Sequence, residues 1–567
     1  MKPPPHVLFP IGKNGGPQRL IDKASEKSSI RVQVGVRTCP ECGTSTISCR
    51  CDCGAHTQTR ESPQDLSVDL SRMMREASET LGEPIPEKIK AVEGLISKDK
   101  VPEPLEKGIL RRKHEIFVNK DGTIRFDLTD VPLTHFRPRE IGLELDRAHR
   151  LGYTHDIYDQ ELVSGEQLCE LKVQDIVPSV GCGDFMVRVA KFVDDLLVKL
   201  YGMDQYYLAE VREDLIGHLA IGLAPHTSGG ILCRIIGYTD AQVCYGHPFF
   251  HAAKRRNADG DEDSVMLLLD GLLNFSRAYL PDSRGGLMDA PLVLAIRLDP
   301  NEIDKEAHNI DVLWEYPLSF YHATMEMKHP KDVQEQMDMV ANRINSLLQY
   351  EGFGFTLDTN DIAEGPRESS YKTLGSMTDK MNAQLRLARM IRAVDEQDVA
   401  QRIISKHFLP DLIGNLKQFS GQKVRCTKCG ASYRRVPLAG KCYCGNNLTL
   451  TVHEASVKKY LAVTKRVGQE YQVSQYIQQR VALIEESLWS IFGKIEVDPN
   501  VSIEDLDSMV EVEEALDGAP TLDSFCIASE IVDTVSEEEI MTCSSLPEMP
   551  LQQEVKRKGS CKLDDFF

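Results

Sequence analysis

The pattern of apolar positions divides the chain into a part rich in strands and a part rich in helices. Apolar residues alternate with polar ones from Ile30 to Val36, and the β-branched runs at 230–238 and 291–298 are typical of buried strands. The stretch 114–127 predicts a β-hairpin, because Asp121-Gly122 is a strong turn signal between alternating arms. Apolar residues at helical spacing predict helices at 66–81, 86–96, 183–201, 333–350, 378–391 and 398–418, and a helix pair within 456–492.

These elements predict a multidomain α+β protein. Short strands between 215 and 321 suit a β-barrel, and helices dominate the chain after that region. We expect eight parts: a β-rich segment at 1–60, a mixed α/β region at 61–214, a barrel at 215–330, a helical region at 331–420, a cysteine module at 421–452, a helical partner-binding region at 453–495, an acidic linker at 496–558 and a tail at 559–567. The basic and aromatic residues at 458–466 are compatible with a solvated helical face or with a DNA or partner contact.

Composition and charge are consistent with this predicted domain organisation. The chain has 567 residues, 41% of them hydrophobic, which is enough for several sizeable cores. The net charge of −20 is unevenly placed and is concentrated between Glu496 and Glu548, so it does not exclude a nucleic-acid-binding surface elsewhere. No apolar run approaches the ~18 residues that span a bilayer, and no secretory signal follows Met1, so we expect a cytoplasmic protein without membrane contact.

More than half of the sixteen cysteines fall into two groups with the spacing of metal ligands. The second group has one clear set, in which each pair is followed by glycine: Cys426, Cys429, Cys442 and Cys444. Four thiolates on two tight turns can hold structural zinc in a closed tetrahedral site. Disulfides would be scattered more evenly along the chain.

The first group has one cysteine too many for such a site. By analogy with the second group, its ligands are Cys39, Cys42, Cys51 and Cys53. Cys49 could replace Cys51, and the spacing leaves that choice open. We expect both modules to be zinc ribbons that stabilise small folds with little core, and not to take part in catalysis.

One acidic segment follows three cations directly. Lys254, Arg255 and Arg256 precede four polar side chains at alternate positions, Asn257, Asp259, Asp261 and Asp263. In an extended segment these four side chains would lie on one face, and Gly260 would permit a sharp turn. Mg²⁺ prefers one or two protein carboxylates and leaves its other positions to water and substrate phosphates. The segment therefore predicts a magnesium site, with the cations contacting a nucleic-acid backbone or a nucleotide.

Other interpretations of this segment are weaker. A calcium loop of the EF-hand type needs Gly at its sixth position and Glu at its twelfth, and no register starting at Asn257 or Asp259 provides both. A solvated acidic turn remains an alternative on the carboxylates alone. His247 and His251 are four residues apart, but Pro248 argues against a regular helix between them, so we expect structural hydrogen-bonding roles for both.

The sequence from His251 to Leu294, which includes KRRNADGDEDSVMLLLDGLL, resembles the catalytic segment of the large subunit of archaeal family D DNA polymerase. The resemblance implies that this segment belongs to a double-psi β-barrel, in which Asp259 and Asp261 bind the catalytic Mg²⁺ and Asn257 supports them. It implies no role for the three cations. It extends over nearly the whole chain and corresponds to the C-terminal part of that subunit.

The last residues of the chain resemble a sliding-clamp-binding box. Leu563, Phe566 and Phe567 have the spacing that places an aliphatic and two aromatic side chains on one side of a helical turn. Ser560 stands where such a box usually has Gln, which removes one polar anchor. The acidic stretch before this tail has few aromatic residues and is typical of disordered linkers.

These expectations describe the catalytic part of a replicative DNA-directed DNA polymerase that acts on a primer-template and dNTPs. The resemblance implies a small subunit as partner, and we assign to it the 3′→5′ exonuclease activity of the complex. The resemblance also implies a lysine-rich segment in the same active site, which would lie before Met1. A separate polypeptide that forms the N-terminal half of the large subunit, a split gene, or a start placed at an internal methionine would each account for this, and the sequence leaves the choice open. The alternative is a non-catalytic scaffold that docks the small subunit and the sliding clamp. An RNA polymerase-like barrel acting on RNA is disfavoured by the tail.

Overall fold

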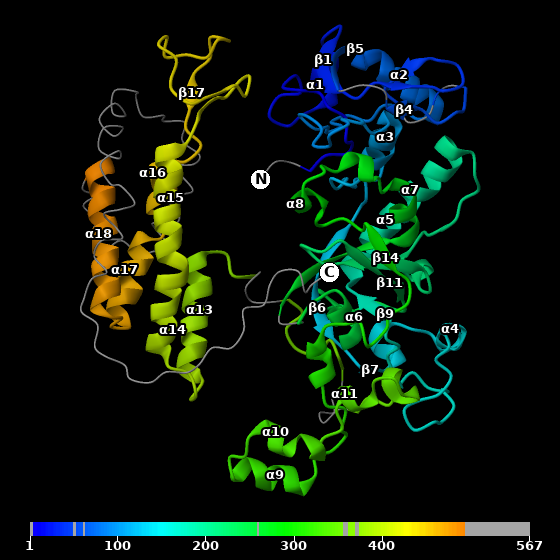
Figure 1. The fold of residues 1–567 in the computed structure, drawn as a ribbon, viewed down its shortest axis with the longest axis vertical. Helices are drawn as coiled ribbons and strands as arrows, with labels where there is room; N and C mark the ends of the chain where they lie inside the picture. The colour runs from blue at the N-terminus through cyan, green and yellow to red at the C-terminus, as the bar shows by residue number, and fades with distance from the viewer. Residues whose placement is uncertain are drawn as a thin grey trace, which may run out of the picture. The chain divides into compact units, whose positions relative to one another are not determined.

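The computed structural model describes residues 4–48, 51, 53–59, 63–257, 260–354, 361–368 and 373–493. The chain forms two compact units. The first comprises Met1–Gly375 with Lys428–Gly430, and the second comprises Ser376–Thr427 with the chain from Ala431 onward. Each unit is described by itself (Figure 1).

A closed six-stranded barrel forms the centre of the first unit. Its strands, in their order around the barrel, are β10 (Leu219–Leu223), β13 (Glu262–Leu267), β6 (Phe126–Pro132), β12 (Val243–Gly246), β9 (Asp175–Pro178) and β11 (Gly229–Ile235). β11 also pairs with β10, which closes the sheet, and β14 (Val293–Ala295) is added to the outside of β11. The closed barrel agrees with the predicted fold class.

Parallel and antiparallel pairs are mixed around the barrel. β6 is parallel to β12 and antiparallel to β13, and the register places Thr129 opposite both Val243 and Glu262. β9 is parallel to β11 and antiparallel to β12. Two of the six strands, β6 and β9, therefore lie before the range 215–330 in which we expected the whole barrel. These strands are short or carry polar residues at alternate positions, so their apolar content alone did not mark them as barrel strands.

One long helix packs against this barrel. α5 (Val180–Leu196) begins at Ser179, whose hydroxyl oxygen accepts a hydrogen bond from the backbone N–H of Cys182. Its apolar side chains, including Phe192 and Val193, are buried in the same core as residues of β6, β11 and β13. A π turn (Leu197–Tyr201) continues the helix, so the helix expected at 183–201 is confirmed.

The other elements of the first unit surround the barrel and form smaller sheets. Its remaining strands are β1 (Ile30–Val34), β2 (Arg37–Thr38), β3 (Ser45–Thr46), β4 (Gln58–Thr59), β5 (Gln64–Val68), β7 (His135–Phe136) and β8 (Cys169–Glu170). Its remaining helices are α1 (Ile21–Ser25), α2 (Leu70–Leu81), α3 (Leu105–Lys113), α4 (Leu145–Leu151), α6 (Pro248–Ala253), α7 (Leu268–Asn274), α8 (Arg284–Leu287), α9 (Leu318–Met325), α10 (Pro330–Val333) and α11 (Val340–Arg343). β1 pairs with β5, and residues of β1, α2 and α3 share the core of the barrel.

The second unit is helical and carries a small sheet. Its helices are α13 (Met377–Met390), α14 (Glu396–Ile403), α15 (Leu409–Gly421), α16 (Glu454–Lys458), α17 (Leu461–Glu470) and α18 (Gln475–Phe492). Apolar residues of α13, α14, α17 and α18 form its core. The sheet contains β15 (Val424–Cys426) between β16 (Ser432–Tyr433) and β17 (Leu448–Thr449). The helices expected at 378–391 and 398–418 and the helix pair in 456–492 are confirmed in type.

The predicted hairpin at 114–127 is wrong. Asp121 and Gly122 do form a turn, and Asn119 N–H donates to the carbonyl of Thr123 across it. The flanking arms bond to other partners, however: Val118 N–H donates to the carbonyl of Pro5, and Ile124 N–H donates to the carboxylate of Asp270. A turn signal fixes the local bend, but distant partners decide where the arms pair.

Two expected helices are also absent from the described structure. Residues 86–96 pair in an extended conformation with the start of the chain, where Val92 N–H donates to the carbonyl of Phe9. Within 333–350 the chain forms only single helical turns, α11 and two 3-10 turns, and Asn345 has a φ of 66° that interrupts any continuous helix. Both stretches have helical spacing, but tertiary contacts determine their conformation.

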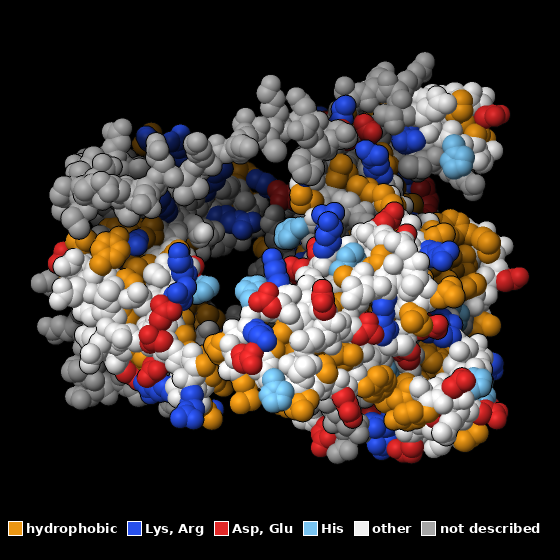
Figure 2. Space-filling model, turned by 60° about the horizontal axis from the view of Figure 1, so that its bottom comes forward, with side chains coloured by type: hydrophobic (Ala, Val, Ile, Leu, Met, Phe, Trp, Pro, Cys, Tyr) orange, Lys and Arg blue, Asp and Glu red, His pale blue; other side chains and the backbone are white. Residues whose placement is uncertain are grey.

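Charged side chains of both signs are interspersed with hydrophobic ones on the face of the molecule in Figure 2. The described residues on that face thus form no single acidic surface. Within the part of the chain that the structure describes, no helix has the length and apolar character needed to cross a membrane.

Candidate functional site

The acidic segment is the loop between α6 and β13. α6 begins after His247, whose Nδ1 accepts a hydrogen bond from Phe249 N–H, and Pro248 occupies the first helical position. Proline is favoured there because the missing N–H has no partner in the first turn. Pro248 therefore starts a helix, where we had expected it to argue against one.

α6 ends in a left-handed turn at the three cations. Arg255 N–H donates to the carbonyl of Ala252, and Arg256 N–H donates to the carbonyl of His251. This is the hydrogen-bond pattern of a Schellman motif, which requires the residue at its bend to have a positive φ. That residue is Arg255, with a φ of 60°. Glycine is the residue that adopts this conformation without strain, so the chain accepts a strained arginine here.

Lys254 is buried against residues of the barrel strands β6, β10 and β13. Its side chain is 1% exposed, and its Nζ lies 2.8 Å from Oδ2 of Asp130 and 2.5 Å from Oδ2 of Asp263. Gly222 on β10 makes this position possible, since a Cβ there would lie 2.6 Å from the ring of Phe250 and 3.3 Å from Cδ of Lys254. The buried position differs from the surface contact with nucleic acid that we had expected for Lys254.

Arg256 is also held within the protein. Its Nε donates to Oδ1 of Asp263 at 2.9 Å, and its Nη2 donates to the carbonyl of Pro225 at 3.0 Å. Its Nη1 lies 3.9 Å from Oδ1 of Asp261. Arg255 differs from both neighbours, because its side chain is exposed and its guanidinium has no hydrogen bond or ion pair with any residue that the structure describes.

The acidic residues of the segment do not share one environment. Asp263 is buried, with its side chain 1% exposed, whereas the side chain of Asp261 is 32% exposed. Asn257 and Gly260 are exposed. Asp259 lies outside the described residues, so its predicted position is not tested. The carboxylate of Asp261 is thus partly exposed to solvent, whereas that of Asp263 is buried against Lys254 and Arg256.

Burial and neighbouring charges together shift the pKa values of Asp130, Asp263 and Lys254. Burial opposes ionisation of Asp130, but its contacts with His251 and Lys254 hold the pKa of that carboxyl well below its usual range. Burial, together with the neighbouring Asp130, raises the pKa of Asp263 to about 6. Burial disfavours the charged form of Lys254, yet the two carboxylates raise its pKa above the ordinary value.

The two histidines have structural positions, as we had expected. His247 is buried, and burial lowers its pKa to about 3. His251 is buried, and its Nε2 lies 3.1 Å from the carbonyl oxygen of Val131. Its Nδ1 lies 3.2 Å from Oδ2 of Asp130.

Sequence analysis missed Asp130. It lies on β6, more than a hundred residues before the loop, and its N–H donates to the carbonyl of Asp261 at 2.9 Å. A signal was present, since Leu128 and Asp130 occupy the buried positions of an alternating strand. An acidic residue at a position where the pattern calls for an apolar one indicates a buried partner.

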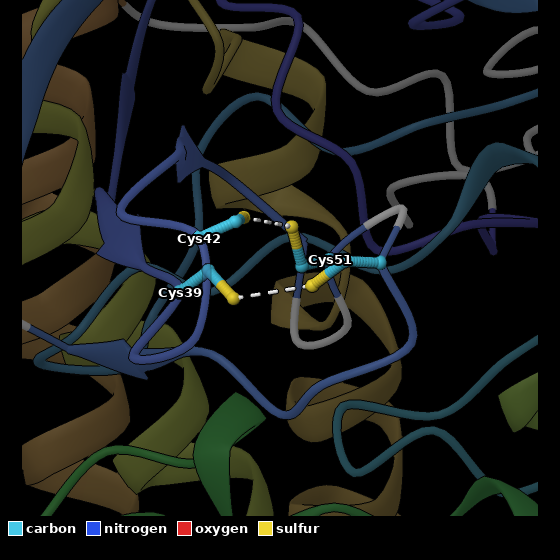
Figure 3. Close-up of side chains that lie close together, drawn as sticks. Cys39, Cys42 and Cys51 are labelled. Carbon is cyan, nitrogen blue, oxygen red and sulfur yellow. Dashed lines mark hydrogen bonds between the residues drawn. The ribbon is translucent and has the colours of Figure 1, made fainter.

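The first cysteine cluster lies on the sheet formed by β2, β3 and β4. Figure 3 shows Cys39 and Cys42 directed toward the turn that carries Cys51. Sγ of Cys39 lies 3.4 Å from Sγ of Cys53, and Sγ of Cys42 lies 3.5 Å from Sγ of Cys51. Thiolates around a zinc ion at ~2.3 Å have sulfur atoms about 3.8 Å apart, so these residues fit the metal. Cys49 lies outside the described residues.

The second cluster repeats the backbone of the first. Its four sulfur atoms, from Cys426, Cys429, Cys442 and Cys444, lie within 4.8 Å of one another. Cys39 N–H and Cys426 N–H donate to the carbonyl five residues later, and Cys51 N–H and Cys442 N–H donate to the carbonyl four residues later. These four cysteines are also the buried members of the two clusters. Cys51 therefore occupies the position of Cys442.

The fold and these sites define a class of protein: a mixed α+β chain with a closed six-stranded β-barrel and two four-cysteine zinc-binding clusters. Comparison with known families narrows the class. Residues 82–380 match the model of the catalytic domain of DNA polymerase II large subunit DP2, and residues 1–72 match its central domain. Residues 420–476 match the zinc finger domain of DNA polymerase-epsilon. The chain belongs to the family of archaeal family D DNA polymerase large subunits.

Individual relatives agree with this assignment. The chain is 54% identical over 525 residues to the DNA polymerase II large subunit of Methanocella arvoryzae, and the match covers 87% of this chain and 46% of that protein. It is 50% identical over 524 residues to the large subunit of Pyrococcus furiosus, covering 87% of this chain and 42% of that protein. The chain thus spans less than half the length of these curated relatives.

Proposed function

We propose that this chain is the catalytic, C-terminal part of the large subunit of a replicative DNA-directed DNA polymerase. In this reaction the 3′-oxygen of a primer bonds to the α-phosphorus of a dNTP, and the bond to pyrophosphate breaks. Asp259 and Asp261 hold Mg²⁺ at the acidic loop, and Asn257 supports them. The observation that carries the proposal is that the family's catalytic-domain model covers this loop, where the barrel leaves the carboxylate of Asp261 partly exposed.

The residues present fit a magnesium ion. Among the residues that the structure describes, the cation nearest to the carboxylate of Asp261 is Nη1 of Arg256, at 3.9 Å, so this carboxylate has no close ion pair there. Gly260 precedes it with a φ of 110°, in open space. Hard, partly hydrated carboxylate oxygens are the ligands that Mg²⁺ prefers. The chemistry that this metal supplies when bound is neutralisation of charge on the phosphates and activation of the 3′-hydroxyl.

Arg255 is the cation that fits the role of a phosphate contact. It is exposed and keeps a positive φ that glycine would adopt without strain. An arginine in such a strained conformation is compatible with a functional role for its side chain. Of the three cations that we assigned to the DNA or nucleotide, we therefore keep Arg255 for this role. Lys254 is buried in ion pairs, and Arg256 is held by Asp263 and the carbonyl of Pro225.

The remaining parts of the proposal concern partners. The small subunit carries the 3′→5′ exonuclease of the complex and docks on the helical region at 453–495. A polypeptide that corresponds to the N-terminal half of the relatives completes the active site, in keeping with the match of this chain to less than half of their length. Leu563, Phe566 and Phe567 bind the sliding clamp, and these residues lie outside the described structure. The two zinc ions are structural.

Primer extension tests the catalytic assignment. The full chain is combined with the small subunit, Mg²⁺, primer-template and dNTPs, with and without a polypeptide that corresponds to the N-terminal half of the relatives. We expect extension only with that polypeptide, and a loss of at least about 100-fold in Asp259→Asn and Asp261→Asn, because each removes a metal ligand. Glu262→Gln removes one charge from the residue directly after Asp261, the first of β13, and serves as the matched control.

Two outcomes would contradict the proposal. If both aspartate variants extend primers as fast as Glu262→Gln and the unmodified chain, the acidic loop does not hold the catalytic metal. If no combination extends a primer while binding to the small subunit and the sliding clamp is intact, the chain is a non-catalytic scaffold. Binding of both partners is measured in the same preparations by size-exclusion chromatography.

A further inference from the structure

The base of the acidic loop is closed by buried ions. Lys254 follows the last residue of α6, and Asp263 is the second residue of β13, so their contact joins the two ends of the loop. Their charged atoms lie 2.5 Å apart, and both side chains are 1% exposed. A charged pair at this depth holds its geometry closely, because either group alone would be a buried charge without a partner.

Asp130 connects this closure to the backbone of Asp261. Its carboxylate contacts Lys254 at 2.8 Å, while its own N–H donates to the carbonyl of Asp261 at 2.9 Å. One residue of β6 therefore fixes both the buried cation and the residue whose carboxylate we assign to the metal. A shift of Lys254 or Asp130 would move the backbone of Asp261.

Arg256 adds contacts on the solvent side. Its guanidinium joins Asp263 to the carbonyl of Pro225 in the loop between β10 and β11, and lies 3.9 Å from Oδ1 of Asp261. The acidic loop is thus tied to β6, to β13 and to the loop between β10 and β11. We call Asp130, Lys254, Arg256 and Asp263 the loop anchor.

We propose that the loop anchor positions the carboxylate of Asp261 for its metal, and that its charged residues are positioning residues that do not touch nucleic acid. This inference rests on the proposed function. Stability alone does not require the charges, since buried ion pairs can often be replaced by apolar groups of similar volume without loss. The charges of the loop anchor instead stabilise one conformation of the acidic loop.

The decisive variant replaces the three buried charges together, as Asp130→Leu, Lys254→Met and Asp263→Leu. Arg256 then loses Asp263, but it is partly exposed and keeps its hydrogen bond to the carbonyl of Pro225. We expect this triple variant to fold and to need at least about 10-fold more Mg²⁺ for half-maximal extension, because a ligand displaced by about 1 Å binds and reacts poorly. Binding of Mn²⁺ to the zinc-loaded chain, measured by electron paramagnetic resonance without substrate, should weaken by a similar factor.

A partly buried pair elsewhere in the same barrel, with side chains 26% and 5% exposed, provides the control. Arg234 and Asp175 are joined by two contacts of 2.8 and 2.6 Å between β11 and β9, and neither belongs to the loop. The double variant Asp175→Leu and Arg234→Met should leave the Mg²⁺ requirement unchanged. A milder variant, Arg256→Gln, covers the case in which the triple variant does not fold, and we expect about a 3-fold rise in the Mg²⁺ requirement because two contacts of the partly exposed Arg256 are lost.

The outcomes separate this inference from the proposed function. If Asp261→Asn abolishes Mn²⁺ binding while the folded triple variant and Arg256→Gln bind Mn²⁺ as the unmodified chain does, the loop anchor has no positioning role. If Asp261→Asn itself leaves Mn²⁺ binding and extension unchanged, the proposed metal site fails. A rise in the Mg²⁺ requirement of the control pair as large as that of the triple variant would also overturn the inference, because the effect would then be a general one of the barrel.

Discussion

The barrel and the two cysteine modules are held together by different forces. The barrel buries a continuous core, to which strands and helices from the whole first unit contribute. The modules have strands of two or three residues, and between 424 and 449 the buried residues are Cys426, Ala431 and Cys442. Exposed side chains such as Leu438 and Tyr443 add nothing to a core there. A segment of this kind depends on its metal for its fold, whereas the barrel depends on apolar burial.

Removal of zinc should give the largest difference in stability between the cysteine modules and the barrel. We expect the native chain to contain about two zinc ions, and chelation to unfold the modules, because structural zinc contributes on the order of 10 kcal/mol to such folds. Thiol alkylation followed by mass spectrometry measures this. The eight cysteines of the clusters should become reactive, while the four buried cysteines of the barrel unit remain protected: Cys169, Cys182, Cys233 and Cys244. Alkylation of all twelve at the same rate would show that the barrel also depends on metal.

A buried charge should be the most sensitive point of the barrel unit. Arg111 and Glu103 form an ion pair with both side chains fully buried. Arg111→Met leaves the carboxylate of Glu103 without its cation, and we expect a loss of about 3–5 kcal/mol in the free energy of unfolding. The chain has two tryptophans, Trp314 in the first unit and Trp489 in the second, so a Trp489→Phe background reports on the first unit alone.

The matched control for this variant is the neighbouring residue. The side chain of Arg112 is 29% exposed, and its ion pair with Glu115 is largely solvated, so Arg112→Met should cost less than about 1 kcal/mol. A Trp314→Phe background should show no shift of the second unit with either variant. Equal destabilisation by the two methionine variants would mean that the Glu103 pair adds nothing to the barrel unit.

The smallest effect on the free energy of unfolding is expected at Arg255, whose strained backbone we attribute to the function of its side chain. Arg255→Gly removes strain at a φ of 60°, so the free energy of unfolding should stay level or rise by up to ~1 kcal/mol. Primer-template affinity should fall, and the slope of its logarithm against the logarithm of salt concentration should become shallower by about 1, because one phosphate contact is lost. Arg255→Asn is the control that keeps a side chain tolerant of positive φ. An unchanged salt slope in both variants would remove Arg255 from the phosphate contacts.

The same contrast explains what could be predicted from the sequence. The ligands of each cluster lie within a short stretch, so spacing alone brought them together, and the structure agrees with the grouping. Long helices such as α5 and α13 were also predicted, because their period is local. Both kinds of prediction depend on neighbours along the chain.

The strand pairing of the barrel could not be predicted from residues that are close together in the sequence. β6 pairs with strands more than a hundred residues away, so neither its partners nor the role of Asp130 could be derived from spacing. Lys254 was expected at the surface because charge alone suggests solvation, yet two distant carboxylates make its burial favourable. The hairpin expected at 114–127 failed for the same reason, since its arms bond to Pro5 and Asp270.

The strand order of the barrel also constrains how the protein is synthesised. β6 lies between β12 and β13, so both of its edges stay open until the ribosome has made more than a hundred further residues. At usual elongation rates this delay is on the order of ten seconds. During that time an unpaired strand can pair with another chain, which favours aggregation. Any fragment that ends before Val243, or that begins after Pro132, would leave the barrel permanently open.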